Sequence, residues 1–150
     1  MNESIVQHEI EMIFNFLSIQ LQSVHLDYDQ DLDISLIIIK CDPSDHIQRE
    51  FNRDFSLILR FLFERKHGVD ENFILDINGE QRKTIESTKQ KARIAAQRVR
   101  TFKKPYEFGP LSSYERMIVH SVLKQESGVE TQSVGEGRDR RLFVKNKKDQ

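Results

Sequence analysis

Residues 110–128 read PLSSYERMIVHSVLKQESG, and this stretch contains the start, body and end of a helix. Ser112 and Glu115 have the spacing of a capping box, in which each side chain accepts a hydrogen bond from the backbone amide of the other residue. The predicted helix then runs over residues 113–125. Gly128 follows at a position where a left-handed turn ends a helix. The sequence therefore predicts a helix with both ends defined.

The two sides of this helix differ in chemistry. At about 100° per residue, one side carries the apolar residues Tyr114, Ile118, Val119, Val122 and Leu123. Arg116, His120 and Lys124 follow one another in four-residue steps on the opposite side, which we expect to face solvent. All three can donate hydrogen bonds to an anion, and a guanidinium suits phosphate oxygens. By itself, however, this spacing is more often that of a face that only keeps a helix in solution.

Strands are predicted on both sides of the helix. Residues 105–108 form one strand, and residues 129–134 and 141–145 form a hairpin joined by Gly135–Asp139. These strands predict a small three-stranded sheet. Upstream, residues 79–102 form a long helix with a narrow apolar seam consisting of Ile85, Thr88, Ala92, Ala95, Ala96 and Val99. Its other faces are expected to expose the basic residues Arg82, Lys83, Lys89, Lys91, Arg93, Arg98 and Arg100.

The composite pattern of residues 105–145 resembles the R-3-H domain, which is named for an arginine and a histidine separated by three residues. Arg116 and His120 match that pair, and the match continues through Gly128–Ser133, Gly135–Glu136 and Arg140–Arg141. The resemblance implies binding of single-stranded nucleic acid, with RNA as the expected ligand. The predicted nucleic-acid site consists of Arg116, His120, Lys124, Thr131, Ser133, Arg138, Arg140 and Arg141. Tyr106 and Phe108 are further candidates for stacking on bases, although core burial is expected for at least one of them.

The N-terminal half has a different element pattern. An amphipathic helix is predicted over residues 4–22, followed by strands over residues 24–28 and 34–40. Ser44 or Asp45 can cap a short helix that continues to about Phe51. A second helix, with Phe55, Leu59, Leu62 and Phe63 on its buried side, ends at Gly68, and residues 73–77 form a third strand. The predicted order is therefore α-β-β-α-α-β.

This order resembles the type II KH fold, and a KH unit followed by a long helix and an R-3-H domain resembles the Jag (KhpB) family of bacterial cytoplasmic RNA-binding proteins. Leu75–Asn78 and Gln81–Arg82 are similar to the junction of that family. The predicted fold class is α+β, with a KH type II-like unit at residues 1–78, a long helix plus R-3-H domain at residues 79–147, and a tail at residues 148–150. The additional N-terminal domain that Jag proteins commonly carry is not expected.

One feature of the KH resemblance fails. KH domains hold four nucleotides with a GxxG loop, because glycine lets backbone amides approach phosphate. The corresponding residues are Glu50–Arg53, and no glycine occurs between Cys41 and His67. We therefore expect the KH-like half to have lost ordinary RNA gripping and to act as a scaffold or dimerisation unit.

Charge is divided unequally along the chain. The formal net charge is −1, but residues 1–78 contain six Lys and Arg against 15 Asp and Glu, whereas residues 79–150 contain 17 against nine. The halves therefore carry −9 and +8. This asymmetry fits a polyanion-binding half joined to a half that repels polyanions, although a dipolar solvated surface would have the same composition.

Other functions find little support in the sequence. The five histidines are scattered without zinc-ligand spacing, and no cofactor motif is complete, so neither catalysis nor a cofactor nor a metal is expected. The single cysteine, Cys41, fits a reducing compartment, and no signal peptide or membrane-spanning segment is predicted, so we expect a cytoplasmic protein without membrane insertion. The expected partners are single-stranded RNA or DNA, together with self-association or a protein partner through the KH-like half. The alternative function is a protein-interaction adaptor that uses the acidic half and binds little nucleic acid.

Overall fold

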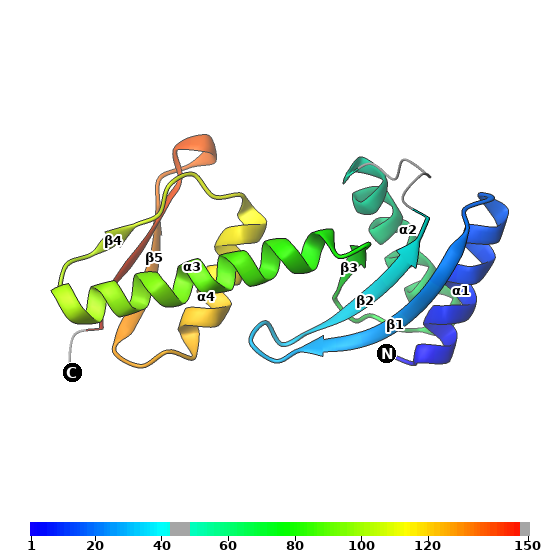
Figure 1. The fold of residues 1–150 in the computed structure, drawn as a ribbon, viewed down its shortest axis with the longest axis horizontal. Helices are drawn as coiled ribbons and strands as arrows, with labels where there is room; N and C mark the ends of the chain where they lie inside the picture. Colours follow the sequence, from blue (N-terminus) through cyan, green and yellow to red (C-terminus); the bar gives the residue numbers. More distant parts are fainter. Residues whose placement is uncertain (43–48, 148–150) are drawn as a thin grey trace. The chain divides into compact units, whose positions relative to one another are not determined.

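The computed structural model describes residues 1–42 and 49–147, which contain four α-helices and six β-strands in two small sheets (Figure 1). This mixed content confirms the predicted α+β class. By their internal contacts the residues form two compact units, Met1–Arg82 and Lys83–Gln150. Each unit is described separately below.

The first unit packs two helices on one face of a sheet. Its elements are α1 (Glu3–Phe16), β1 (Leu21–Asp29), β2 (Ile34–Cys41), α2 (Arg49–His67) and β3 (Phe73–Ile77). The strand order is β1-β2-β3, with β1 antiparallel and β3 parallel to β2. The core joins Val6, Ile10 and Phe14 of α1 to Phe55, Leu59 and Phe63 of α2, over alternate residues of the strands such as Val24, Ile37, Ile39, Leu75 and Ile77.

Helix α1 is shorter than predicted. The apolar spacing continues through Leu17 and Leu21, but the helix ends at Phe16 and Ser18 takes a left-handed backbone conformation with φ of 57°. Leu21 instead begins β1, opposite Cys41 of β2. The periodic spacing extended the predicted helix too far because Leu21 packs against the same core from a strand.

The second helix also differs from the prediction. The predicted start of a short helix at Ser44 or Asp45 lies outside the described residues. From Arg49 onward a single helix, α2, is continuous to His67, and Phe51 stacks on Phe55 at 5.3 Å between ring centroids. The segment Glu50–Arg53, predicted as the loop between two helices, therefore lies in the first turns of α2. The described residues of this unit show the order α-β-β-α-β.

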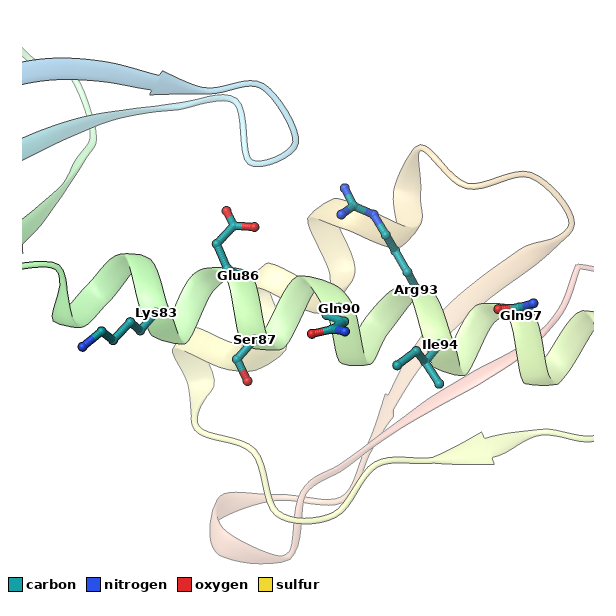
Figure 2. Close-up of a pocket in the computed structure, with 7 residues that line it drawn as sticks. All are labelled: Lys83, Glu86, Ser87, Gln90, Arg93, Ile94 and Gln97. Carbon is teal, nitrogen blue, oxygen red and sulfur yellow. The ribbon is translucent and has the colours of Figure 1, made fainter.

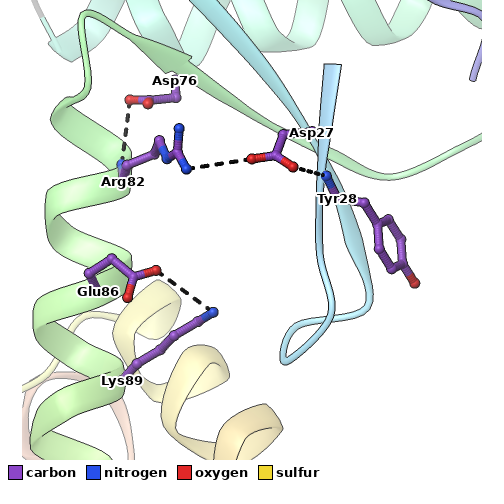
Figure 3. A network of polar contacts seen from close by, with 6 residues as sticks. All are labelled: Asp27, Tyr28, Asp76, Arg82, Glu86 and Lys89. Carbon is purple, nitrogen blue, oxygen red and sulfur yellow. Dashed lines mark hydrogen bonds and ion pairs between the residues drawn. The ribbon is translucent and has the colours of Figure 1, made fainter. Parts of the chain in front are cut away.

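A buried carboxylate fixes the start of α3 (Glu80–Phe102). Asn78 and Gly79 both have positive φ, so the chain turns sharply after β3. Asp76 is fully buried, and its Oδ1 accepts hydrogen bonds from the backbone amides of Gln81 at 2.9 Å and Arg82 at 3.4 Å. Figure 3 shows this carboxylate beside the first turn of α3. Gly79, the residue directly before α3, has no side chain that could cap the helix. Asp76 provides the cap instead.

The seam predicted for α3 is confirmed, because all six of its residues are buried. One basic residue departs from the prediction. Lys89, expected on a solvated face, is only 4% exposed, and its Nζ lies 3.9 Å from Oε1 of Glu86 (Figure 3). A long aliphatic stem lets lysine bury its carbons beside the seam while the ammonium reaches a carboxylate.

The second unit contains a three-stranded antiparallel sheet, as predicted. It adds β4 (Tyr106–Glu107), α4 (Ser113–Lys124), β5 (Val129–Val134), a 3-10 turn (Gly137–Asp139) and β6 (Arg141–Asn146). The strand order is β4-β6-β5. Ile118, Val119, Val122 and Leu123 of α4 are buried, as are Leu142 and Val144 of β6. The predicted hairpin and the predicted apolar side of α4 are both confirmed.

Both helices of this unit lie on the same face of its sheet. Tyr106 pairs with Val144, which pairs with Thr131, so these three side chains share a face. Helix α3 reaches that face through Arg98, whose guanidinium lies 5.8 Å from the centre of the Tyr106 ring, and α4 reaches it through His120, which contacts Thr131. His120, on the polar side of α4, therefore lies against a strand and not in open solvent.

Candidate nucleic-acid interface

The capping box predicted for α4 is present. Ser112 Oγ accepts the amide hydrogen of Glu115 at 3.1 Å, and Glu115 Oε2 accepts that of Ser112 at 2.8 Å. These two bonds fix where the helix begins, and therefore which residues turn toward β5. The positions of Arg116 and His120 follow from that start.

His120 is held between two hydroxyl groups of β5. Its Nδ1 lies 2.6 Å from Thr131 Oγ1, and its Nε2 lies 3.1 Å from Ser133 Oγ. Thr131 and Ser133 share a face because residues two apart on a strand point the same way. In a neutral ring one nitrogen donates and the other accepts, so one hydroxyl receives a hydrogen bond and the other supplies one. The structure thus brings together three residues of the predicted site.

Two arginines act on the same histidine. Burial lowers the pKa of His120 below its ordinary value of 6.5, and the positive charges of Arg140 and Arg116 lower it further. Both guanidinium groups must therefore lie near enough to oppose a third positive charge. At neutral pH the site consists of a neutral imidazole between hydroxyls, with cations around it.

Arg116 is oriented by its own helix start. Its Nη1 donates to the carbonyl oxygen of Leu111 at 2.7 Å, and its Nη2 donates to Ser113 Oγ at 2.8 Å. These bonds use two of the five N–H groups of the guanidinium and hold the plane of the group in place. We predicted neither anchor, although the three-residue step from Ser113 to Arg116 was a usable signal.

Arg116 and His120 were expected to face open solvent, and the structure shows them to be less exposed than that. Both side chains are half-buried, and Lys124, the last residue of α4, is exposed. The helical period correctly separated them from the apolar side. The helical period could not show that β5 would partly cover His120, or that the start of the helix would partly cover Arg116.

The loop between β5 and β6 supplies the remaining basic groups. Gly135 has φ of 88°, and a Cβ there would lie 3.0 Å from the carbonyl oxygen of Asp139, so this loop needs glycine. Arg138 and Arg140 are exposed on it. Arg141 has a different position, because it pairs with Val134 and so lies on the sheet face opposite Ser133. Its Nη1 donates to the carbonyl oxygens of Arg138 at 2.9 Å and Arg140 at 3.3 Å, which stabilises the loop.

The two aromatic candidates are separated by burial. Phe108 is 4% exposed and belongs to the core. Tyr106 is half-buried and lies edge-on to Phe108, with Arg98 over its ring. Only Tyr106 keeps some exposed ring surface.

A shallow hollow lies elsewhere in this unit, along the outer face of α3. Figure 2 shows its lining, which is formed by Lys83, Glu86, Ser87, Gln90, Arg93, Ile94 and Gln97. It contains none of the predicted site residues. Among residues 1–42 and 49–147, no three His, Cys, Asp or Glu side chains gather as metal ligands, and no helix in these ranges is long and apolar enough to cross a bilayer.

Comparison with known families identifies the second unit. The sequence model of the R-3-H domain matches residues 86–146, which confirms the resemblance for that part of the chain. This domain generally binds single-stranded nucleic acid and is not a catalytic family. No curated protein matches the chain.

Proposed function

We propose that the protein binds single-stranded nucleic acid, with RNA as its natural ligand, through the surface formed by Arg116, His120, Thr131, Ser133 and Arg140. Lys124, Arg138 and Arg141 complete this surface at its edges. The observation that carries the proposal is the cluster itself, in which His120 lies between the hydroxyls of Thr131 and Ser133 and Arg116 is held in place one turn before it on α4. The positive charges of Arg116 and Arg140 both act on the His120 ring, so an anion is favoured there.

The proposed mechanism begins with electrostatic capture. The second half of the chain carries a formal charge of +8, which attracts a polyanion. A phosphate between Arg116 and Arg140 would offset their repulsion of His120 and so favour its protonated form, in which both ring nitrogens donate. Of the two aromatic candidates, Tyr106 and Phe108, only Tyr106 has exposed ring surface on which a base could stack.

The choice of RNA and the nature of the first unit rest on the Jag resemblance. We propose a KH-like unit at residues 1–78 that no longer grips nucleic acid, in a protein that acts in the reducing cytoplasm of a bacterium. Two observations support loss of gripping: the Glu50–Arg53 segment is helical, and this half carries a charge of −9. Cys41 is a free thiol with 2% exposure, which fits a reducing compartment.

The adaptor alternative is favoured by one observation, the exposed apolar residues of α2 in the first unit. These residues support a contact with protein. They do not bear on the basic surface of the second unit, so a protein contact and nucleic-acid binding are compatible.

The test is a binding titration against salt with single-stranded RNA, single-stranded DNA and duplex of one sequence. Each phosphate contact to a single strand contributes roughly 0.7 to the slope of log affinity against log salt. Arg116→Ala should lower affinity for single strands and reduce that slope by about 0.7. Arg116→Lys keeps the charge but loses the planar fork, so it should keep the slope and lose affinity.

The matched control is Arg93→Ala, which removes one cation from the outer face of α3 (Figure 2). It should leave affinity for short strands close to wild type. Equal losses for Arg93→Ala and Arg116→Ala would contradict the proposed surface, because binding would then depend on total charge alone. Equal affinity for duplex would contradict the single-strand assignment.

A further inference from the structure

Helix α2 exposes an unusual set of large apolar side chains. Leu57 is 57% exposed, Ile58 55% and Phe61 62%. They lie on the side of α2 opposite Phe55, Leu59 and Phe63, which fill the core of the first unit. Each of the three is therefore more than half exposed. An apolar group of this kind on a helix commonly marks a contact with another molecule.

Two opposite charges flank the apolar residues on the same side of the helix. At about 100° per residue, Asp54, Leu57, Ile58, Phe61 and Arg65 fall within one stripe roughly 100° wide. We name these five residues the α2 stripe. Its acidic residue is nearest the start of the helix and its basic residue nearest the end. Arg65 lies 5.6 Å from the centre of the Phe61 ring, and within the described residues neither Asp54 nor Arg65 forms an ion pair.

We infer that the α2 stripe pairs with the α2 stripe of a second copy of this chain, with the two helices antiparallel. The stripe has an internal symmetry that supports this pairing. The midpoint between Asp54 and Arg65 falls between Leu59 and Arg60, and the midpoint between Ile58 and Phe61 falls at the same place. A twofold axis there sets each Asp54 against the partner's Arg65 and each Ile58 against the partner's Phe61. Every contact then occurs twice, as a closed twofold interface requires.

Charge argues against the other occupants. A parallel pairing would set Asp54 against Asp54 and Arg65 against Arg65, so like charges would meet at both ends. An anionic membrane surface would be opposed by the −9 charge of this half of the chain. The antiparallel pair is the arrangement in which apolar residues meet apolar residues and opposite charges meet at both ends.

This inference deepens the self-association that the sequence analysis predicts for the first unit, and it rests on that prediction. It does not depend on nucleic-acid binding by the second unit. A dimer would carry two basic surfaces, so a strand long enough to reach both would bind more tightly than a short one. A short strand would bind one surface only.

Sedimentation equilibrium of the full chain provides the test through charge exchange. Wild type should dimerise. Asp54→Arg and Arg65→Asp should each weaken the dimer by about tenfold or more, because each places two like-charged pairs in the interface. The double variant should regain dimerisation. An equimolar mixture of the two single variants should also dimerise, because the mixed pair sets opposite charges at both ends.

Controls separate this surface from general effects of charge and folding. Asp70→Arg changes an exposed acidic residue outside α2 and should leave the dimer unchanged. Phe61→Ser should give a folded monomer, with its circular dichroism and melting temperature measured beside wild type. In all these variants the affinity for a short oligonucleotide should remain that of wild type, so failure of the dimer and failure of nucleic-acid binding give different readouts.

Several outcomes would overturn the inference. A monomeric wild type at the highest concentration measured would do so, as would a dimer that survives both the single charge exchanges and Phe61→Ser. Restoration by neither the double variant nor the mixture would exclude the antiparallel register. Binding of the wild-type monomer to phosphatidylcholine–phosphatidylglycerol vesicles through Phe61 would assign the stripe to a lipid surface instead.

Discussion

Helices α2 and α4 are both amphipathic, yet the sides that they turn away from the core have opposite characters. On α4 that side carries Arg116 and His120, and each is held by neighbouring groups of the same unit. On α2 it carries Ile58 and Phe61, which are both more than half exposed. The comparison shows that a helical period identifies the side that meets the core. The use of the other side depends on which strands and loops pack beside it.

The largest effect is expected from truncating matched isoleucines of the two helices. Ile118 of α4 is fully buried, so Ile118→Ala should lower the free energy of unfolding by about 2–5 kcal/mol. Ile58 of α2 is 55% exposed, so Ile58→Ala should change it by less than about 0.5 kcal/mol in the monomer. Denaturant unfolding at low protein concentration measures both. Similar costs would mean that the outer side of α2 is covered after all.

The loop that supplies cations to the polar side of α4 should respond strongly to glycine substitution. Gly135→Ala combines a left-handed conformation with a Cβ 3.0 Å from the carbonyl oxygen of Asp139, and it should cost about 2 kcal/mol. Gly137→Ala has φ of 53° with no atom within 4 Å of its Cβ, and should cost about 1 kcal/mol. Thermal unfolding compares them. If Gly137→Ala were the more harmful, the close approach at Gly135 would not be the constraint.

The capping box sharpens the comparison because it fixes the rotation of α4. Ser112→Ala removes the acceptor of the Glu115 amide and should lower stability by about 1 kcal/mol. Ser112→Asp keeps an acceptor and should preserve most of that stability. Ser112→Ala should also bind an oligonucleotide more weakly than Ser112→Asp does, because Arg116 is anchored to the carbonyl of Leu111 beside this cap. Binding that is unaffected by Ser112→Ala would separate the cap from the site.

The smallest effect should appear as a pH dependence. Burial and then the charges of Arg140 and Arg116 lower the pKa of His120 below 6.5, so the unfolded chain takes up this proton before the folded chain does. The stability contributed by the neutral ring is present above pH 6.5 and is lost as the pH falls below it. His120→Gln should therefore lose less stability than wild type on acidification from neutral pH. Parallel curves for the two proteins would show that His120 is not the group responsible.

Glu9 gives this measurement an internal reference in the first unit. Its burial would raise its pKa, but hydrogen bonds and charge from Lys66 and His67 outweigh that effect and hold the pKa below 4.5. The stability from this carboxylate is thus present above pH 4.5 and is lost at more acid pH. The acid effect that comes from Glu9 therefore falls at lower pH than the one that comes from His120.

Local pattern was sufficient for several elements. Strand β3 was predicted over residues 73–77 as observed, and the capping box at Ser112 and the seam of α3 have the partners or burial that their spacing predicted. These features depend on residues within a few positions of one another. The end of α1 and the continuity of α2 through Phe51 were not predicted, because they go with strand pairing at Leu21 and packing of Phe51 against the core of the first unit.

By itself the sequence determined the α+β class, the opposite charges of the two halves, the R-3-H pattern and the separation of Arg116 and His120 from the apolar side of their helix. Only the tertiary structure decided that Thr131 and Ser133 would hold His120, that Arg141 would support the loop from the far sheet face, and that Leu57, Ile58 and Phe61 would remain exposed. The physical reason is range: a helical or strand period is set by neighbours along the chain. Hydrogen bonds, burial and charge repulsion depend on groups brought together from distant positions.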